Sequence, residues 1–235
     1  MDSLKRQARV AGLLYTIVAI TGPVSLVYIP HKLFTAGQAL GAADRVRSLE
    51  SLLRLGVASE LFYQTIEVFL VLALYGLFKT VNTTRARQMA ILGLLPIPIV
   101  LVVVLNEIAA LMLTSSPRFL SVFGKPQLDA LATLFMGLHA QGLQVAALFW
   151  GLWLFPLGSL VIRCGFIPKA LGVSAMVAGV GYLIGSTASL VIRQYASSLS
   201  GIAGILQVGE LPIILWLLIW GARAQPSDSK LAAAV

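Results

Sequence analysis

Four glutamates and one histidine interrupt apolar stretches of this chain that are long enough to cross a membrane. They are Glu60, Glu67, Glu107, Glu210 and His139. A charged side chain at the centre of a bilayer costs roughly 2.5–3.5 kcal/mol on insertion scales, so such residues face the interior of a bundle or a wet cavity. No Lys or Arg lies near them in the same stretches. We therefore expect the acids either to hold protons or to meet a positive partner from outside the chain.

Amide side chains accompany these acids. Glu60, Gln64 and Glu67 are four and three residues apart, so they share one side of a helix. The candidate ligand-binding residues are Glu60, Gln64, Asn106, Glu107, His139, Gln207 and Glu210.

The expected depth of these residues brings most of them to one level. At about 1.5 Å per residue, four of them lie about 7–14 Å below the outer ends of helices that run in alternating directions. These four are Glu60, Glu107, His139 and Glu210. Glu67 lies about 18 Å down, near mid-membrane, and is a candidate proton relay. The shared level predicts one acidic pocket in the outer half of the membrane.

Several functions are compatible with such a pocket. Imidazole, carboxylate and amide donors suit a divalent cation such as Zn²⁺, Mn²⁺ or Mg²⁺, with Glu107, His139 and Glu210 as candidate ligands. A bound metal activates water, which would suit hydrolysis of a lipid-like substrate. The sequence has no HExxH and no histidine triplet. Three alternatives therefore stay open: a site for a small polar or cationic molecule or a lipid headgroup, a proton or ion pathway in a transporter, and hydrogen bonding between helices in a structural or accessory subunit.

The composition predicts an all-α, polytopic membrane protein. The chain is 58% hydrophobic and only 11% charged, whereas a soluble domain has about 25% charged residues. Apolar runs of about 20 residues predict six spanning helices, over residues 10–29, 55–78, 88–113, 130–162, 168–192 and 201–222. The fourth is too long for a hydrocarbon core of about 30 Å, and we expect it to break near Pro156 and Gly158.

We expect one transmembrane domain over residues 1–224 and a disordered tail over 225–235. Charged and apolar residues at helical spacing over about 42–54 predict an interfacial helix on the outer surface. Of the 17 basic residues, ten fall on the side of the N-terminus and seven on the other. By the positive-inside rule, both termini are expected in the cytoplasm.

The net charge of +8 does not indicate nucleic-acid binding. The basic residues lie in short loops and tails, and they form no stripe with interleaved aromatic residues. Cys164 is the only cysteine, which excludes an intramolecular disulfide. Membrane lipids are the expected partners, together with a small-molecule or lipid ligand for the pocket.

Several short segments resemble one family. They are ARVAGLLY (8–15), ESLLRLG (50–56), Asn106-Glu107, FWGLWLFPLG (149–158), GFIPK (165–169) and Gly209-Glu210. Over almost the entire chain, the sequence resembles the bacterial multi-pass membrane family known as domain of unknown function 4386. The resemblance implies a bacterial membrane protein of about six helices, which we expect in the inner membrane, and it implies no activity or catalytic residue. It also places Asn106, Glu107 and Glu210 in family-like segments, which favours a role for them.

Overall fold

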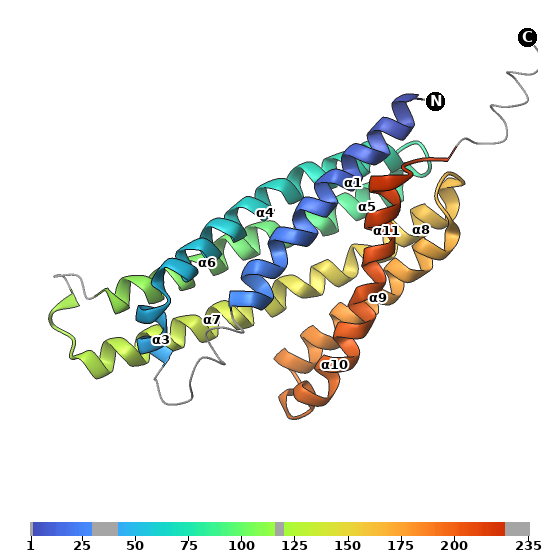
Figure 1. The fold of residues 1–235 in the computed structure, drawn as a ribbon. Coiled ribbons are helices and arrows are strands. Elements are labelled where there is room, and N and C mark those ends of the chain that lie inside the picture. Colours follow the sequence, from blue (N-terminus) through green and yellow to red (C-terminus); the bar gives the residue numbers. More distant parts are fainter. Residues whose placement is uncertain (1, 30–41, 116–119, 224–235) are drawn as a thin grey trace, which may run out of the picture. The chain divides into compact units, whose positions relative to one another are not determined.

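The computed structural model describes residues 2–29, 42–115 and 120–223, which are predominantly helical and contain no strand (Figure 1). Six helical stretches are long and apolar enough to cross a membrane. They are Ser3–Leu26, Glu50–Phe78, Thr83–Thr114, Lys125–Cys164, Lys169–Leu190 and Arg193–Ile219. The prediction of an all-α membrane bundle with six spans is confirmed. The tail predicted over 225–235 lies outside the described residues.

The helices are named as in Figure 1. In chain order they are α1 (Asp2–Pro23), η1 (Val24–Tyr28), α3 (Ala42–Ser48), α4 (Glu50–Phe78), α5 (Thr83–Leu94), α6 (Pro96–Thr114), α7 (Lys125–Leu152), α8 (Leu154–Cys164), α9 (Lys169–Leu190), η3 (Arg193–Tyr195), α10 (Ala196–Gln207), η4 (Val208–Glu210) and α11 (Leu211–Ile219).

Contacts between residues divide the chain into two compact units. Unit 1 comprises Met1–Ile17, Ile66–Pro96 and Gln144–Val235, and unit 2 comprises Val18–Thr65 and Ile97–Leu143. Helices α1, α4 and α7 contribute to both units. The single domain expected over residues 1–224 stays a prediction.

Prolines explain where the long spans are interrupted. A proline nitrogen cannot bond to the carbonyl four residues earlier, and its ring clashes with that carbonyl. Helix α5 ends at Leu94, four residues before Pro98, and α7 ends at Leu152, four residues before Pro156. The break expected at Pro156 therefore falls one turn earlier, at Trp153. The sixth span is also interrupted, by the 3₁₀ turn η4, which hydropathy did not predict.

Several helices begin earlier than hydropathy predicts. The third span starts at Thr83 instead of residue 88, because the side chain of Asn82 caps it by accepting a hydrogen bond from the backbone N–H of Arg85 at 2.9 Å. Helix α1 likewise starts at Asp2 instead of residue 10. A hydropathy window does not register such polar first turns.

The segment 42–54, predicted as one interfacial helix, is divided between two helices, and its place at the membrane surface stays a prediction. Helix α3 ends at Ser48, and the residues from Glu50 onward already belong to the spanning helix α4. Val46 and Leu53 are both buried in one apolar cluster of unit 2. Arg47 of α3 forms an ion pair with Asp129 of α7. The amphipathic start of this segment therefore packs against other helices of its own unit.

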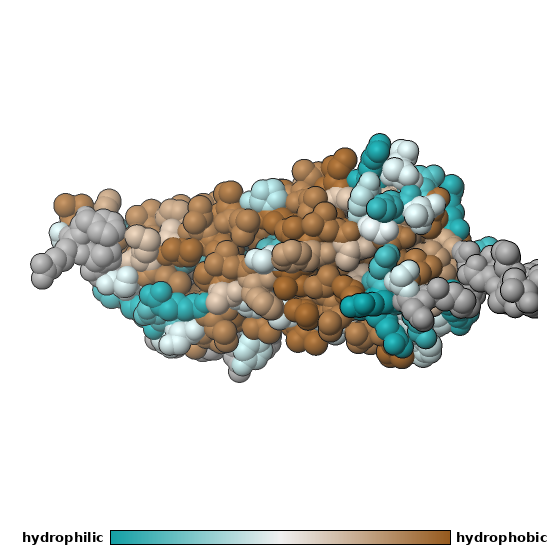
Figure 2. All heavy atoms as spheres, turned by 90° about the horizontal axis from the view of Figure 1, so that it is seen from above, coloured by the Kyte–Doolittle hydropathy of each residue, from teal (hydrophilic) through white to brown (hydrophobic). Residues whose placement is uncertain are grey.

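Large apolar side chains lie on the surface of the helices. Figure 2 shows hydrophobic residues over most of the visible face. Val102, Ile91 and Ile205 are 64%, 61% and 75% exposed. Soluble monomers rarely expose contiguous apolar patches larger than a few hundred Å², so this surface is suited to contact with lipid.

Candidate functional site

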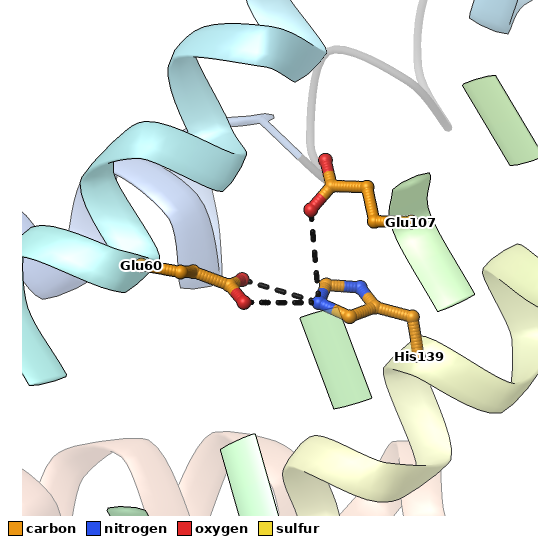
Figure 3. Close-up of side chains that lie close together, drawn as sticks. All are labelled: Glu60, Glu107 and His139. Carbon is orange, nitrogen blue, oxygen red and sulfur yellow. Dashed lines mark hydrogen bonds and ion pairs between the residues drawn. The ribbon is translucent and has the colours of Figure 1, made fainter. Parts of the chain in front are cut away.

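Three side chains from three different helices meet inside unit 2. Glu60 comes from α4, Glu107 from α6 and His139 from α7 (Figure 3). Nε2 of His139 lies 3.2 Å from each carboxylate oxygen of Glu60 and 3.8 Å from Oε2 of Glu107. One potential ligand atom from each residue lies within 4.8 Å of the other two. Both carboxyl groups therefore converge on one imidazole nitrogen.

The group is buried and contains more acidic than basic side chains. Glu60, Glu107 and His139 are only 0%, 2% and 5% exposed. Among the described residues, neither glutamate forms an ion pair with Lys or Arg. Up to two negative charges thus share one imidazole, which carries at most one positive charge. The described residues do not balance the charge of the site when both acids are ionised.

A glycine brings α6 and α7 close together at this level. Gly142 lies one turn after His139, and Val103 lies one turn before Glu107. A Cβ atom at position 142 would lie only 2.3 Å from Cγ2 of Val103. Because a side chain at this position would push the helices apart, the absent Cβ helps to hold His139 and Glu107 at their short separation.

A second glycine makes room on α4. Gly56 lies one turn before Glu60, and a Cβ atom there would lie 3.2 Å from Oε1 of Glu107. The same atom would lie 2.9 Å from Cδ1 of Ile29. The carboxyl group of Glu107 therefore lies directly against the backbone of α4.

Gln64 carries buried polar atoms that the described part of the chain leaves without hydrogen bonds. It is 1% exposed and lies one turn after Glu60 on the same side of α4. Neither its amide nitrogen nor its amide oxygen has a hydrogen-bond partner. Oε1 of Glu60 also has no hydrogen-bond partner, since the hydrogen bond between His139 and Glu60 involves Oε2. Each buried polar group without a partner costs about 1–3 kcal/mol, so the amide of Gln64 and Oε1 of Glu60 are available to bind a ligand.

The remaining predicted residues differ in burial and in the unit to which they belong. Asn106 is half-buried, and its amide nitrogen donates to the carbonyl of Val103 in its own helix at 3.1 Å. Gln207, at the end of α10, is half-buried, and Glu67 of α4 is buried. Both belong to unit 1. The membership of Gln207 in one pocket with Glu60 and the role of Glu67 as a proton relay stay predictions.

Glu210 also belongs to unit 1, where two tyrosines donate hydrogen bonds to its carboxylate. The Tyr15 hydroxyl of α1 donates to Oε1, and the Tyr182 hydroxyl of α9 donates to Oε2 at 3.1 Å. Glu210 ends η4, the turn between α10 and α11. The shared depth predicted Glu60, Glu107, His139 and Glu210 in one cavity, with Glu107, His139 and Glu210 as candidate metal ligands. Glu60, Glu107 and His139 meet within unit 2, and the place of Glu210 beside them stays a prediction.

Sequence reasoning missed both tyrosine partners of Glu210. A tyrosine in an apolar run is most simply explained by packing, and no spacing rule links Tyr15 to a residue 195 positions away. It also missed Gly56 and Gly142, whose one-turn spacing from Glu60 and His139 was the available signal.

Comparison with known proteins identifies the family but no activity. No curated protein and no solved structure matches the chain. The model of the family described as "Domain of unknown function (DUF4386)" matches residues 10–221, which is most of the chain. The resemblance noted in the sequence is confirmed, and this multi-pass membrane protein belongs to the DUF4386 family.

Proposed function

We propose that this protein binds a divalent cation, such as Zn²⁺ or Mn²⁺, through Glu60, Glu107 and His139. The observation that carries the proposal is the convergence of two buried carboxyl groups and an imidazole from three helices. In a tetrahedral zinc site with bonds of about 2.0–2.1 Å, the ligand atoms are about 3.3 Å apart. The separations of 3.2 and 3.8 Å at Nε2 are close to that value.

Charge supports the same assignment. Two carboxylates with a neutral imidazole carry a net charge of −2, which a divalent cation neutralises. Mixed nitrogen and oxygen donors suit Zn²⁺ and Mn²⁺, whereas Ca²⁺ and Mg²⁺ prefer oxygen alone. Gln64, one turn from Glu60, offers an amide oxygen as a fourth donor. The metal is then the positive partner that the sequence lacks near these acids.

The unpaired atoms argue against a purely structural role. Hydrogen bonding that only joins helices pairs donors with acceptors, since unsatisfied polar groups are costly in a buried site. Here Gln64 pairs with nothing among the described residues, although Glu60 is one turn away. Metal binding explains both the clustered acids and the free amide.

A second candidate function is hydrolysis of a lipid-like substrate. Glu60, Glu107 and His139 supply three ligands, and this number favours hydrolysis. Catalytic zinc sites have three protein ligands and keep a fourth position for water. In this case Gln64 would orient the water or the substrate without binding the metal. The metal-bound water would be the nucleophile.

Metal analysis of the purified protein tests the proposal. After supply of Zn²⁺ or Mn²⁺ and removal of loose metal, the wild type should retain about one ion per chain. His139→Ala and Glu107→Gln should retain almost none. Glu67→Gln is the matched control, because it neutralises a buried acid of α4 that belongs to unit 1, and it should retain the metal. Equal retention by wild type and His139→Ala would contradict the proposal.

We also infer a bacterial cytoplasmic membrane with both termini inside. Arg9 of α1 donates to the carbonyl of Ile219 at the end of α11 at 2.9 Å, which supports termini on the same side. The distribution of basic residues favours the cytoplasm as that side. A green fluorescent protein fused to the C-terminus should fluoresce, and an alkaline phosphatase fused there should be inactive; the reverse result would contradict this orientation.

A further inference from the structure

A groove in unit 1 has a polar end and an apolar end. It has a volume of about 570 Å³ and is lined by α5, α8 and α9. Arg85, Gln88 and Ser159 supply the polar lining, and Ile91, Phe155 and Met176 belong to the apolar lining. Ligand sites in proteins have volumes of about 300–1,000 Å³, so the groove has the size of a binding site.

The two kinds of lining are separated along the helices. Ile91 lies six residues after Arg85 on α5, which is about 9 Å along the helix axis. On α8 the order is reversed: Ser159 accepts a hydrogen bond from the Arg85 guanidinium, and Phe155 lies one turn earlier. The two helices are thus antiparallel, and both change from polar to apolar in the same direction.

The guanidinium of Arg85 has no acidic partner in this part of the molecule. Among the described residues it forms no ion pair. The sequence contains no Asp or Glu between Glu67 and Glu107, and none between Asp129 and Glu210. Helices α5, α8 and α9 therefore carry no acid at all. A guanidinium has five N–H donors, and Ser159 accepts from only one of its nitrogens.

The position of Arg85 matches the level of lipid headgroups. It is the third residue of α5, where a spanning stretch starts, and the apolar residues of the groove follow toward the membrane interior. Arginine binds phosphate oxygens with two parallel hydrogen bonds. Basic pockets between transmembrane helices bind anionic headgroups.

We propose that this groove is a binding site for an anionic phospholipid. The phosphate group binds Arg85 beside Ser159 and Gln88, and an acyl chain lies along Ile91, Phe155 and Met176. The apolar half of the groove favours a lipid over a soluble anion. The site lies within unit 1 and is independent of the metal proposed for unit 2.

Thermal unfolding in defined bilayers tests this site. The full chain is placed in nanodiscs of phosphatidylcholine, with or without phosphatidylglycerol, and its melting temperature is followed by tryptophan fluorescence. Phosphatidylglycerol should raise the melting temperature of the wild type. The increase should be lost in Arg85→Gln. It should persist in Arg87→Ala, the matched control, because Arg87 is exposed and does not line the groove.

Lipid retention measured by native mass spectrometry gives a second readout that does not depend on stability. Arg85→Gln should lower the apparent affinity for phosphatidylglycerol about tenfold, as expected for loss of a charge-assisted hydrogen bond. Gln88→Trp should also weaken retention, because it fills the groove and leaves Arg85 intact. Unchanged retention in both variants would overturn the proposal. Equal stabilisation of wild type by inorganic phosphate in phosphatidylcholine would also overturn it, because the site would then bind a soluble anion.

Discussion

Nε2 of His139 lies at the same distance, 3.2 Å, from the two carboxylate oxygens of Glu60. One nitrogen cannot donate well to both oxygens, and only Oε2 forms a hydrogen bond. The other carboxylate oxygen, Oε1, has no hydrogen-bond partner among the described residues. A metal ion bound at this position would take the place of the hydrogen bond, since metal ligands must be deprotonated.

We predict that Glu60→Gln weakens Zn²⁺ binding by at least about tenfold, since loss of even a supporting group costs about 10–100-fold. Because protons compete with the metal, the wild-type affinity should also fall as the pH is lowered from about 7 to 5. Competition with a fluorescent chelator measures both effects. An affinity that Glu60→Gln leaves unchanged would exclude Glu60 as a ligand.

Gly142→Ala should separate α6 from α7. The new Cβ would meet Cγ2 of Val103 at 2.3 Å, and overpacking of this kind costs about 1–3 kcal/mol. We expect a lower melting temperature and weaker metal binding, both partly restored in the double variant with Val103→Ala.

Gly137→Ala is the control for this substitution. Gly137 lies on the same helix, and a Cβ atom added there would have no atom of the described residues within 4 Å beyond its own stretch of helix. Alanine in a helix interior is more stable than glycine by about 0.5–1 kcal/mol, so this variant should be as stable as wild type or slightly more stable. Equal melting temperatures for Gly142→Ala and Gly137→Ala would show that the close approach at Val103 is unimportant.

Gln64→Leu should have opposite effects on stability and on metal binding. Leucine removes two unpaired buried polar atoms, and each such group costs about 1–3 kcal/mol, so the metal-free protein should become more stable. The same change removes the fourth donor and should weaken metal binding. Thr65→Leu, at the neighbouring exposed position, should change neither property. A metal-free Gln64→Leu protein that is less stable than wild type would indicate that the amide is satisfied in the folded protein.

Tyr15→Phe and Tyr182→Phe should each destabilise unit 1. Each hydroxyl donates to a carboxyl oxygen of Glu210, and a hydrogen bond contributes about 0.5–1.5 kcal/mol, or more when its acceptor is ionised. The effect should shrink when Glu210 is already replaced by Gln, which a double-mutant cycle measures. Tyr195→Phe is the control, because Tyr195 is 54% exposed. Additive effects of Tyr15→Phe and Glu210→Gln would exclude the interaction.

Hydropathy and residue type were sufficient for the coarse architecture. Runs of about 20 apolar residues predicted six spans, because a bilayer core demands that length, and the structure has six. Proline chemistry also predicted a break in the fourth span. The interruption falls at Trp153, before Pro156, because Pro156 cannot donate a hydrogen bond to the carbonyl of Leu152, four residues earlier.

The sequence by itself determined that acids and a histidine interrupt the apolar runs, and it predicted their depth along each helix from the rise per residue. It did not determine which helices are neighbours or which sides they present to each other. The shared depth predicted that Glu60, Glu107 and His139 lie together, and the tertiary structure places them in one unit. Only the tertiary structure decided that Glu210 accepts hydrogen bonds from Tyr15 and Tyr182 in the other unit. Which helices are neighbours depends on close packing between them, such as Gly142 against Val103, which involves residues far apart in the chain and has no periodicity to reveal it.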